Sequence, residues 1–267
     1  MEAICNDLAA EHEALDAIVA DIEEERWSEI TPFSGWSIQD EISHVAYFDY
    51  AGRLAAADSD AFAKHVEELT KDIQSPSDIH PRALKKGRDM RPPQLLEWWR
   101  EERKAMLAEF EKHDPKDRLP WYGPSMSARS FATARLMETW AHGLDVADTL
   151  GVRREPTDRL KHIAHLGVVT FGWSFTTNGM DVPTQPVRVE LDSPSGDIWT
   201  WGPEETEDVV RGNAEEFCMT VVRRRHVDDT HLEMTGDVAV QWMSIAQAFA
   251  GPPEKRPETG SFPKLDI

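Results

Sequence analysis

The feature of this sequence that most restricts its fold is the spacing of its apolar residues, which changes once, near residue 186. Before that point apolar side chains recur every three or four residues, as on one face of an α-helix, for example at Leu8, Leu15 and Ile22. After it, the segments VRVELD and DIWTWG alternate apolar and polar residues on either side of a turn, which predicts a β-hairpin. The spacing therefore predicts a mainly α-helical chain that ends in a small mixed region.

Caps and helix breakers set the limits of the expected elements. Asn6 is expected to cap the first helix, and Ser37 with Asp40 has the spacing of a capping box for the second. Gly151 is placed to end a helix, and the Pro-rich, basic stretch 74–91 is expected to be a loop. The expected helices cover residues 6–25, 37–57, 59–73, 92–113, 127–150, 157–176, 214–224 and 237–249, with a third strand near 208–211.

This order of elements predicts two domains. Residues 1–182 are expected to form a helical bundle, and residues 183–267 a small α+β domain with a Pro-rich tail. Hydrophobic residues make up 40% of the chain, and its 10 Trp and 10 Phe are enough to build a packed core. Extended disorder is therefore not expected.

The strongly acidic composition restricts the partners of the chain. It has 29 Lys+Arg against 49 Asp+Glu, for a formal net charge of −20. Such a field repels phosphate backbones and anionic lipid over about one Debye length, roughly 8 Å in cells. We therefore expect a small-molecule partner and no nucleic acid, because nucleic-acid binding needs a basic surface.

Neither the cysteines nor the first segment indicates export or membrane insertion. Cys5 and Cys218 are far apart and outside any CxxC motif, as expected in a reducing compartment. The first segment is acidic and helical, unlike a signal sequence, and no apolar run approaches the roughly 18 residues that suggest a membrane span. These features predict a cytoplasmic protein without a membrane partner, and they leave a homodimer open.

An acid four residues before a histidine places both side chains on one face of a helix, where they can hold a divalent ion together. With 49 acids and 10 histidines, about two such pairs are expected by chance in this chain. Four occur, namely Asp40/His44, Glu109/His113, Glu138/His142 and Asp158/His162.

Sequence context separates these pairs. Glu138 and His142 lie in the middle of an apolar helix, where a buried carboxylate needs a cation beside it. His44 lies in the apolar segment ISHVAYF, whereas the two remaining pairs lie near helix ends. Simpler interpretations stay open: His44 as a hydrogen-bonded core histidine, and His142 as a donor to a backbone carbonyl. Glu138 can also pair with Arg135 one turn earlier.

Two segments resemble a known family. GWSIQDEISHVAYFD, residues 35–49, resembles the Gly-Trp…His helix of the DinB-like family, specifically of its mycothiol-dependent maleylpyruvate isomerase branch. RLMETWAHGLDVAD, residues 135–148, resembles the second element of that branch, Glu-xxx-His followed by Asp. In that family the first histidine and the Glu-xxx-His pair coordinate a divalent metal, usually zinc, inside a four-helix bundle. The resemblance implies a metal site of His44, Glu138 and His142.

The resemblance covers about residues 5–180, and the small C-terminal domain resembles the sterol-carrier-like appendage of some family members. The whole chain is most similar to an uncharacterised actinobacterial metal-binding subgroup, and residues that would bind maleylpyruvate cannot be matched. The resemblance implies zinc as the preferred metal, nickel, manganese or iron as alternatives, and mycothiol as a cosubstrate. Three function classes stay open: a thiol-dependent isomerase or transferase, a hydrolase using metal-bound water, and a non-enzymatic protein that binds a metal or an apolar ligand.

Further residues are secondary candidates. Asp145 is placed to accept a hydrogen bond from a ligand imidazole, although it can equally be an exposed acid. Arg135 can steer a carboxylate substrate or neutralise Glu138, and Cys5 and Cys218 have no neighbouring base that would make them nucleophiles. Three tryptophans can line a pocket or belong to the core: Trp36, Trp121 and Trp140. The one dense basic run is Arg223, Arg224 and Arg225, and the reserve metal ligands are His162 and His165.

Overall fold

The computed structural model describes residues 1–32, 35–71 and 79–265, and the chain divides into two compact units, 1–153 and 154–267. The division lies earlier than the expected boundary after residue 182. Two helices of the second unit, α7 (Leu160–Val169) and α8 (Phe171–Thr177), explain the difference, because both pack on other helices of that unit. Helical spacing before residue 186 therefore does not mark membership of the bundle.

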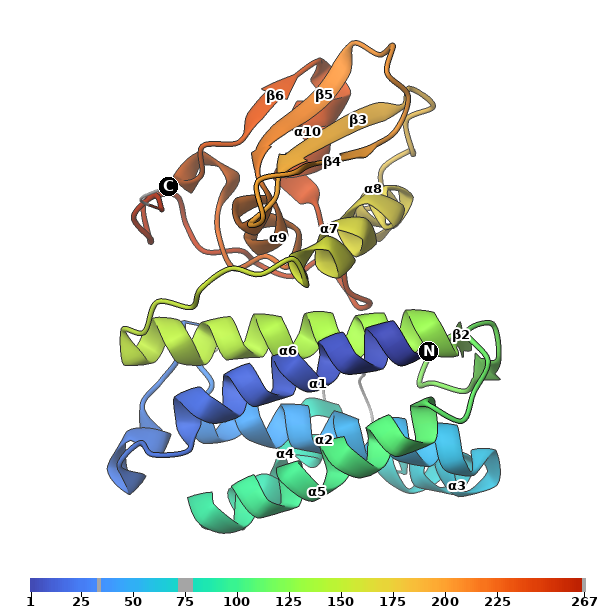
Figure 1. Ribbon diagram of the computed structural model, residues 1–267, viewed down its shortest axis with the longest axis vertical. Helices are drawn as coiled ribbons and strands as arrows, with labels where there is room; N and C mark the ends of the chain where they lie inside the picture. Colours follow the sequence, from blue (N-terminus) through green and yellow to red (C-terminus); the bar gives the residue numbers. More distant parts are fainter. Residues whose placement is uncertain (33–34, 72–78, 266–267) are drawn as a thin grey trace. The chain divides into compact units, whose positions relative to one another are not determined.

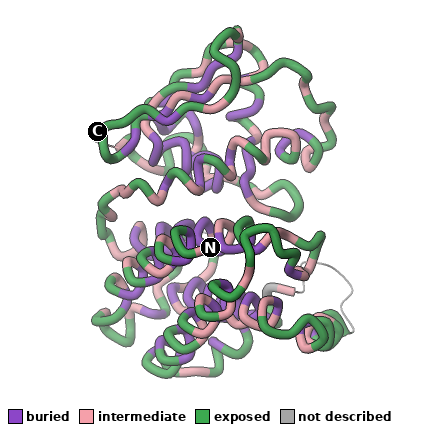
Figure 2. The backbone as a smooth tube through the Cα atoms, turned by 45° about the vertical axis from the view of Figure 1, so that its right-hand side comes forward, coloured by how far each residue is buried: buried purple, intermediate pink, exposed green. Residues whose placement is uncertain are grey.

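Four long helices form the first unit (Figure 1). They are α1 (Glu2–Val19), α2 (Ile38–Ala57), α5 (Pro92–Phe110) and α6 (Ala128–Leu150). Helices α5 and α6 each pack against both α1 and α2. Buried residues run along these helices, while exposed residues predominate in the connections (Figure 2). The predicted mainly helical fold is confirmed.

Local signals in the sequence explain where two of these helices begin and end. The Ser37 hydroxyl accepts a hydrogen bond from the Asp40 backbone N–H, and the Asp40 carboxylate accepts one from the Ser37 N–H, which confirms the capping box at the start of α2. Gly151 ends α6 in the left-handed conformation, at φ 68°, as predicted. The first helix is confirmed, but the predicted cap at Asn6 was wrong, because α1 already starts at Glu2 and contains Asn6; it also ends at Val19, earlier than predicted.

The stretch 74–91, expected to be a loop, contains a helix, α4 (Ile79–Arg88); residues 74–78 of that stretch lie outside the described residues. Its apolar residues Ala83 and Leu84 are buried, and Gly87 packs directly on Ser43 of α2. Tertiary burial thus overrides the loop-like composition. Smaller elements that the sequence analysis missed or set too long are η1 (Glu24–Ser28), α3 (Ser59–Thr70), β1 (Arg118–Leu119) and β2 (Met126–Ser127).

The second unit is built on a four-stranded sheet. Its strands are β3 (Val187–Asp192), β4 (Ile198–Trp201), β5 (Asp208–Asn213) and β6 (Glu233–Thr235), in the order β4-β3-β5-β6. The β3–β4 hairpin and the third strand are confirmed, whereas β6 was missed. Strand β5 pairs parallel to β3, which the sequence pattern does not reveal.

Helices cover the sheet of the second unit. Helix α9 (Ala214–Val221) contacts β3 and β5, and α10 (Asp237–Ile245) contacts β5 and β6. The predicted helix 157–176 is in fact two, because α7 and α8 are separated at Thr170. The small α+β region is confirmed, and its sterol-carrier-like character stays a prediction.

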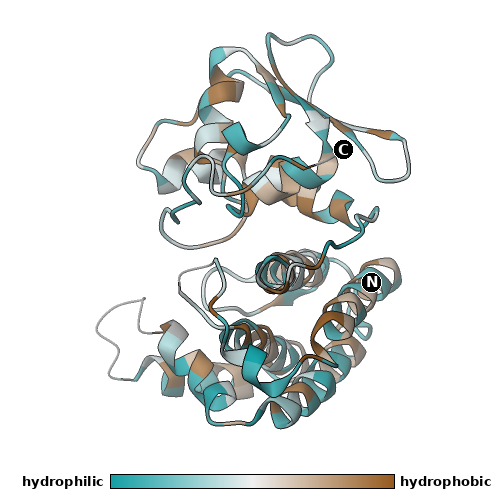
Figure 3. Ribbon diagram, turned by 90° about the vertical axis from the view of Figure 1, so that its left-hand side faces the viewer, coloured by the Kyte–Doolittle hydropathy of each residue, from teal (hydrophilic) through white to brown (hydrophobic). Residues whose placement is uncertain are grey.

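Hydrophobic and hydrophilic residues alternate along the bundle helices, as expected of helices with one buried side (Figure 3). Within the described ranges, no helix has both the length and the apolar character to cross a membrane.

The contact between α4 and α2 makes a testable prediction. A Cβ added at Gly87 would lie 2.0 Å from Ser43 Oγ and 2.4 Å from Ser43 Cβ. Because both residues are buried, Gly87→Ala should lower the free energy of unfolding by about 1–3 kcal/mol through overpacking. Gly123→Ala is the control, since its added Cβ would meet nothing within 4 Å. Equal urea-unfolding midpoints for the two variants would contradict this packing.

Candidate metal centre

Two bundle helices bring the three predicted ligands to one point. His44 comes from α2, while Glu138 and His142 lie one turn apart on α6. Glu138 Oε2 lies 3.4 Å from His44 Nε2 and 3.3 Å from His142 Nε2. One ligand atom from each residue lies within 4.8 Å of those of the other two. Residues 94 positions apart in sequence thus meet where the sequence motifs placed them.

The cluster is enclosed on its histidine side and partly open at the carboxylate. His44 and His142 are only 5% and 4% exposed, whereas the Glu138 side chain is 27% exposed. Trp36 stacks on the His142 ring, with ring centroids 5.8 Å apart and planes at 11°. Phe48 packs on His44 at a centroid distance of 4.6 Å. Aromatic rings therefore hold both imidazoles in place, while Glu138 faces the accessible side.

The two nitrogens of His142 both face carboxylate oxygens. Its Nδ1 lies 2.7 Å from Glu41 Oε2, and its Nε2 lies 3.3 Å from Glu138 Oε2. A neutral imidazole carries one N–H, so it can donate to only one of these carboxylates. With both carboxylates ionised, both contacts are favourable only if His142 is an imidazolium or if another cation lies between Nε2 and Glu138.

The electrostatic state of Glu138 agrees with a cation at this point. Burial alone would raise its pKa, but the hydrogen bonds and positive charges of His142 and His44 in their protonated forms outweigh burial and hold the pKa of Glu138 well below its ordinary value. The carboxylate is therefore ionised at neutral pH and is ready to accept a cation.

The donor set fits a divalent metal. Two imidazole nitrogens and one carboxylate are a common set of protein ligands for a catalytic zinc ion, with one position left for water or substrate. Two ligand atoms that each lie about 2.0–2.1 Å from a tetrahedral zinc ion are about 3.3–3.4 Å apart. The two Nε2–Oε2 separations, 3.3 and 3.4 Å, match that spacing.

Glu41, which contacts His142, was not predicted from the sequence. Glu41 is fully buried, and its Oε1 accepts a hydrogen bond from the Thr31 hydroxyl at 2.6 Å. The predicted acceptor, Asp145, is buried and not exposed, but it lies 3.9 Å from His142 Nδ1. The available signal was position, because Glu41 precedes His44 by one helical turn and so shares its face of α2.

The structure places Arg135 away from the cluster. Its guanidinium is 2% exposed and lies 3.0 Å from Asp49 Oδ1, and it also donates to the Val45 carbonyl. The predicted pairing of Arg135 with Glu138 is therefore replaced by an ion pair with Asp49.

The remaining secondary candidates have other surroundings. Trp121 stacks on Phe62 at a centroid distance of 5.8 Å, and Trp140 is buried on α6. His162 and His165 lie on α7 of the second unit. The three arginines of the basic run are buried, at 6–8% exposed, and Arg223 Nη2 donates to the Ile245 carbonyl.

The cysteines are unsuited to nucleophilic chemistry. Cys5 lies inside α1 and not before it, and both Cys5 and Cys218 are free and buried. Burial raises the pKa of Cys5 to about 11 and raises that of Cys218 well above its ordinary value.

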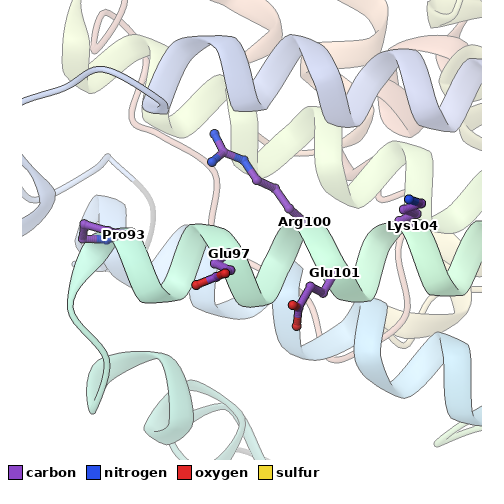
Figure 4. A pocket seen from close by; sticks show the side chains of 5 residues that line it. All are labelled: Pro93, Glu97, Arg100, Glu101 and Lys104. Atoms are coloured by element: carbon purple, nitrogen blue, oxygen red, sulfur yellow. The ribbon is translucent and has the colours of Figure 1, made fainter.

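A surface hollow along α5 has no part in this chemistry. It is lined by the side chains of Pro93, Glu97, Arg100, Glu101 and Lys104 (Figure 4). Arg100 is held by Asp16, at 2.8 and 2.5 Å. None of the candidate ligands lines this hollow.

A four-helix bundle in which two helices present two histidines and a glutamate to one point defines a class of candidate metal-binding bundle proteins. The family model of the mycothiol maleylpyruvate isomerase N-terminal domain matches residues 8–147, more than half of the chain and a range that contains all three candidate ligands. The chain therefore belongs to this family.

Relatives and solved structures extend the comparison to nearly the whole chain. Uncharacterized proteins Rv0036c and MT0041 of Mycobacterium tuberculosis are each 44% identical over 247 residues, which cover 92% of this chain and 95% of the relative. Crystal structures of the mycothiol-dependent maleylpyruvate isomerase and of a histidine-to-alanine mutant match with TM-scores of 0.56 and 0.57. They cover 95% of this chain and 96% of theirs at 16% identity, which establishes a common fold.

Proposed function

We propose that the chain is a metal-dependent enzyme that uses a low-molecular-weight thiol, of the mycothiol type, in an isomerase or transferase reaction. His44, Glu138 and His142 hold one divalent ion, zinc first, with nickel, manganese or iron as alternatives. The main support for this site is the spacing of its ligand atoms: the ionised Glu138 carboxylate has Oε2 3.4 Å from His44 Nε2 and 3.3 Å from His142 Nε2. Family membership supports the thiol, since a mycothiol-dependent enzyme gives the matching family its name.

The residues of the chain have separate tasks in this proposal. His44 and His142 supply neutral nitrogen donors, and Glu138 supplies the negative charge that offsets part of the charge of a divalent ion. Trp36 and Phe48 pack on the two imidazoles and keep water from their faces. A bound divalent ion would favour the thiolate form of a coordinating thiol at neutral pH.

The buried cysteines support an external thiol. Their raised pKa values disfavour a thiolate at neutral pH, so a nucleophilic sulfur has to come from a cosubstrate. The comparisons do not favour the alternatives of a hydrolase or a non-enzymatic binding protein. No substrate is assigned, because the likeness to the solved isomerase is one of fold.

Thermal unfolding of metal-loaded and metal-free protein with mycothiol tests the thiol. A ligand at 100 times its Kd stabilises the folded state by about 2.7 kcal/mol, so the Tm of the loaded protein should rise by about 5–10 °C. S-methylated mycothiol is the control, because its thioether cannot ionise, and it should give little or no shift. If mycothiol raised the Tm of loaded and metal-free protein equally, its binding would not depend on the metal, which would contradict the proposal.

A further inference from the structure

The arrangement around Glu41 carries an inference about how His142 presents its metal-binding nitrogen. Glu41 is fully buried on α2, and both of its oxygens are engaged. Oε2 lies 2.7 Å from His142 Nδ1, and Oε1 accepts the Thr31 hydroxyl at 2.6 Å. A carboxylate accepts hydrogen bonds and donates none, so the contact with Nδ1 requires a proton on that nitrogen. In neutral His142 the lone pair is then on Nε2, which faces Glu138 and His44.

We infer that Glu41, held by Thr31, is a positioning residue that keeps the proton of His142 on Nδ1 and so makes Nε2 the metal-donor atom. This inference rests on the proposed metal site. A carboxylate behind a ligand imidazole fixes its tautomer and orientation and increases its basicity, and loss of such a partner typically weakens metal binding by about 10–100-fold.

Backbone pairing just before α2 fixes two residues that contact Glu41 and His142. Thr31 N–H donates to the Trp36 carbonyl at 2.7 Å, and Ile30 forms a β-bridge with Ser37. The paired backbone thus fixes Thr31, which orients the Glu41 carboxylate, and Trp36, which stacks on the His142 ring. One loop therefore sets both the hydrogen bond and the plane of the imidazole.

An alternative interpretation is that Glu41 and His142 belong to a second cation site. Glu41, His142 and Asp145 also bring ligand atoms within 4.8 Å of one another, and all three are buried. The hydrogen bond from Thr31 occupies Glu41 Oε1, and the 2.7 Å contact of Oε2 with Nδ1 is a hydrogen-bond distance. These short contacts favour a proton at Nδ1 over a metal ion.

Glu41→Gln tests the inference. The carbonyl oxygen of the substituted amide would accept the Thr31 hydroxyl, and its NH₂ group would then face Nδ1 and move the His142 proton to Nε2. Nitrogen-15 NMR of the imidazoles in metal-free protein, at a pH high enough to make His142 neutral, should show the Nδ1–H tautomer of His142 in the wild type and the Nε2–H tautomer in Glu41→Gln. Competition of the same proteins with a zinc chelator should show Zn²⁺ binding about 10–100-fold weaker in Glu41→Gln.

Two further variants keep the test decisive. Thr31→Val keeps the shape of the side chain but removes the hydrogen-bond donor, so it should weaken Zn²⁺ binding severalfold. Asp40→Asn is the matched control, because it removes the same charge from the adjacent residue of α2, whose carboxylate is held by Arg88. It should lower stability and leave Zn²⁺ affinity within about threefold.

The outcomes separate this inference from the proposed function. Wild-type protein that binds no divalent ion refutes the proposed function, and the tautomer measurement still decides whether Glu41 sets the proton of His142. Normal Zn²⁺ binding by the wild type with unchanged tautomer and affinity in Glu41→Gln overturns the inference alone. Two ions per wild-type chain and one in Glu41→Gln would make Glu41 a ligand, which also overturns it.

Discussion

Asp49→Asn should lower the free energy of unfolding of the bundle by about 3–5 kcal/mol, because it leaves a buried guanidinium without its counter-charge. Asp49 is fully buried, and it lies 3.0 Å from Arg135 of α6, which is 2% exposed. Trp99 of α5 donates to Asp49 at 3.0 Å, and His12 Nε2 of α1 lies 3.2 Å from it. One carboxylate thus ties α2 to the other three bundle helices.

The pH dependence of this effect follows from the pKa of Asp49. Burial raises that pKa, but the charges of Arg135 and His12 outweigh burial and hold it below its ordinary value. The stabilisation is therefore complete above the unfolded-state pKa, about 3.9, and is lost as the pH falls through the lower pKa of the folded state. The difference in stability between wild type and Asp49→Asn should be largest at neutral pH and shrink in acid.

Urea unfolding of Asp49→Asn at a series of pH values measures both effects. Asp89→Asn is the matched control, since it makes the same change in an exposed ion pair. The side chain of Asp89 is 66% exposed and that of its partner Lys85 is 75% exposed. Its cost should be about 0–1 kcal/mol. Equal costs for the two variants at neutral pH would show that Asp49 does not hold the bundle helices together.

The second large effect is expected at the proposed metal site. His142→Ala should weaken Zn²⁺ binding by a hundredfold or more, because an apparent zinc-binding free energy of about 10–16 kcal/mol shared by three protein ligands gives about 3–5 kcal/mol to each. The reduction should also lower the metal content of the purified protein. Chelator competition on metal-free protein reloaded with Zn²⁺ measures the affinity, and elemental analysis measures the content.

The matched control is His113→Ala. Glu109 and His113 have the same four-residue spacing as Glu138 and His142, but His113 bonds to the Ala56 carbonyl and lies 3.2 Å from Asp117. Its removal should leave Zn²⁺ affinity within about threefold. Full metal content and affinity in His142→Ala would remove His142 from the ligand set.

Local signals predicted the helices that carry the site. The capping box at Ser37 and the left-handed Gly151 depend on residues near in sequence, so the start of α2 and the end of α6 could be predicted. Helix α4 could not, because its formation depends on burial of Ala83 and Leu84 against distant residues. Composition alone favoured a loop there.

The same distinction explains which site residues were predicted. His44, Glu138 and His142 carry recognisable motifs, and the structure brings them together as expected. The partner of Arg135 was wrong, because local spacing favours Glu138 whereas the fold provides Asp49, 86 residues away in sequence. Glu41 was missed for a similar reason, since it meets His142 across 101 residues.

Anomalous diffraction at the zinc edge from crystals of zinc-loaded protein tests the metal site most directly. We expect one peak per chain, about 2.0–2.2 Å from Nε2 of His44, Nε2 of His142 and a carboxylate oxygen of Glu138, with a further coordination position open. A peak at Nδ1 of His142 beside Glu41, or no peak between α2 and α6 in the loaded protein, would contradict the account.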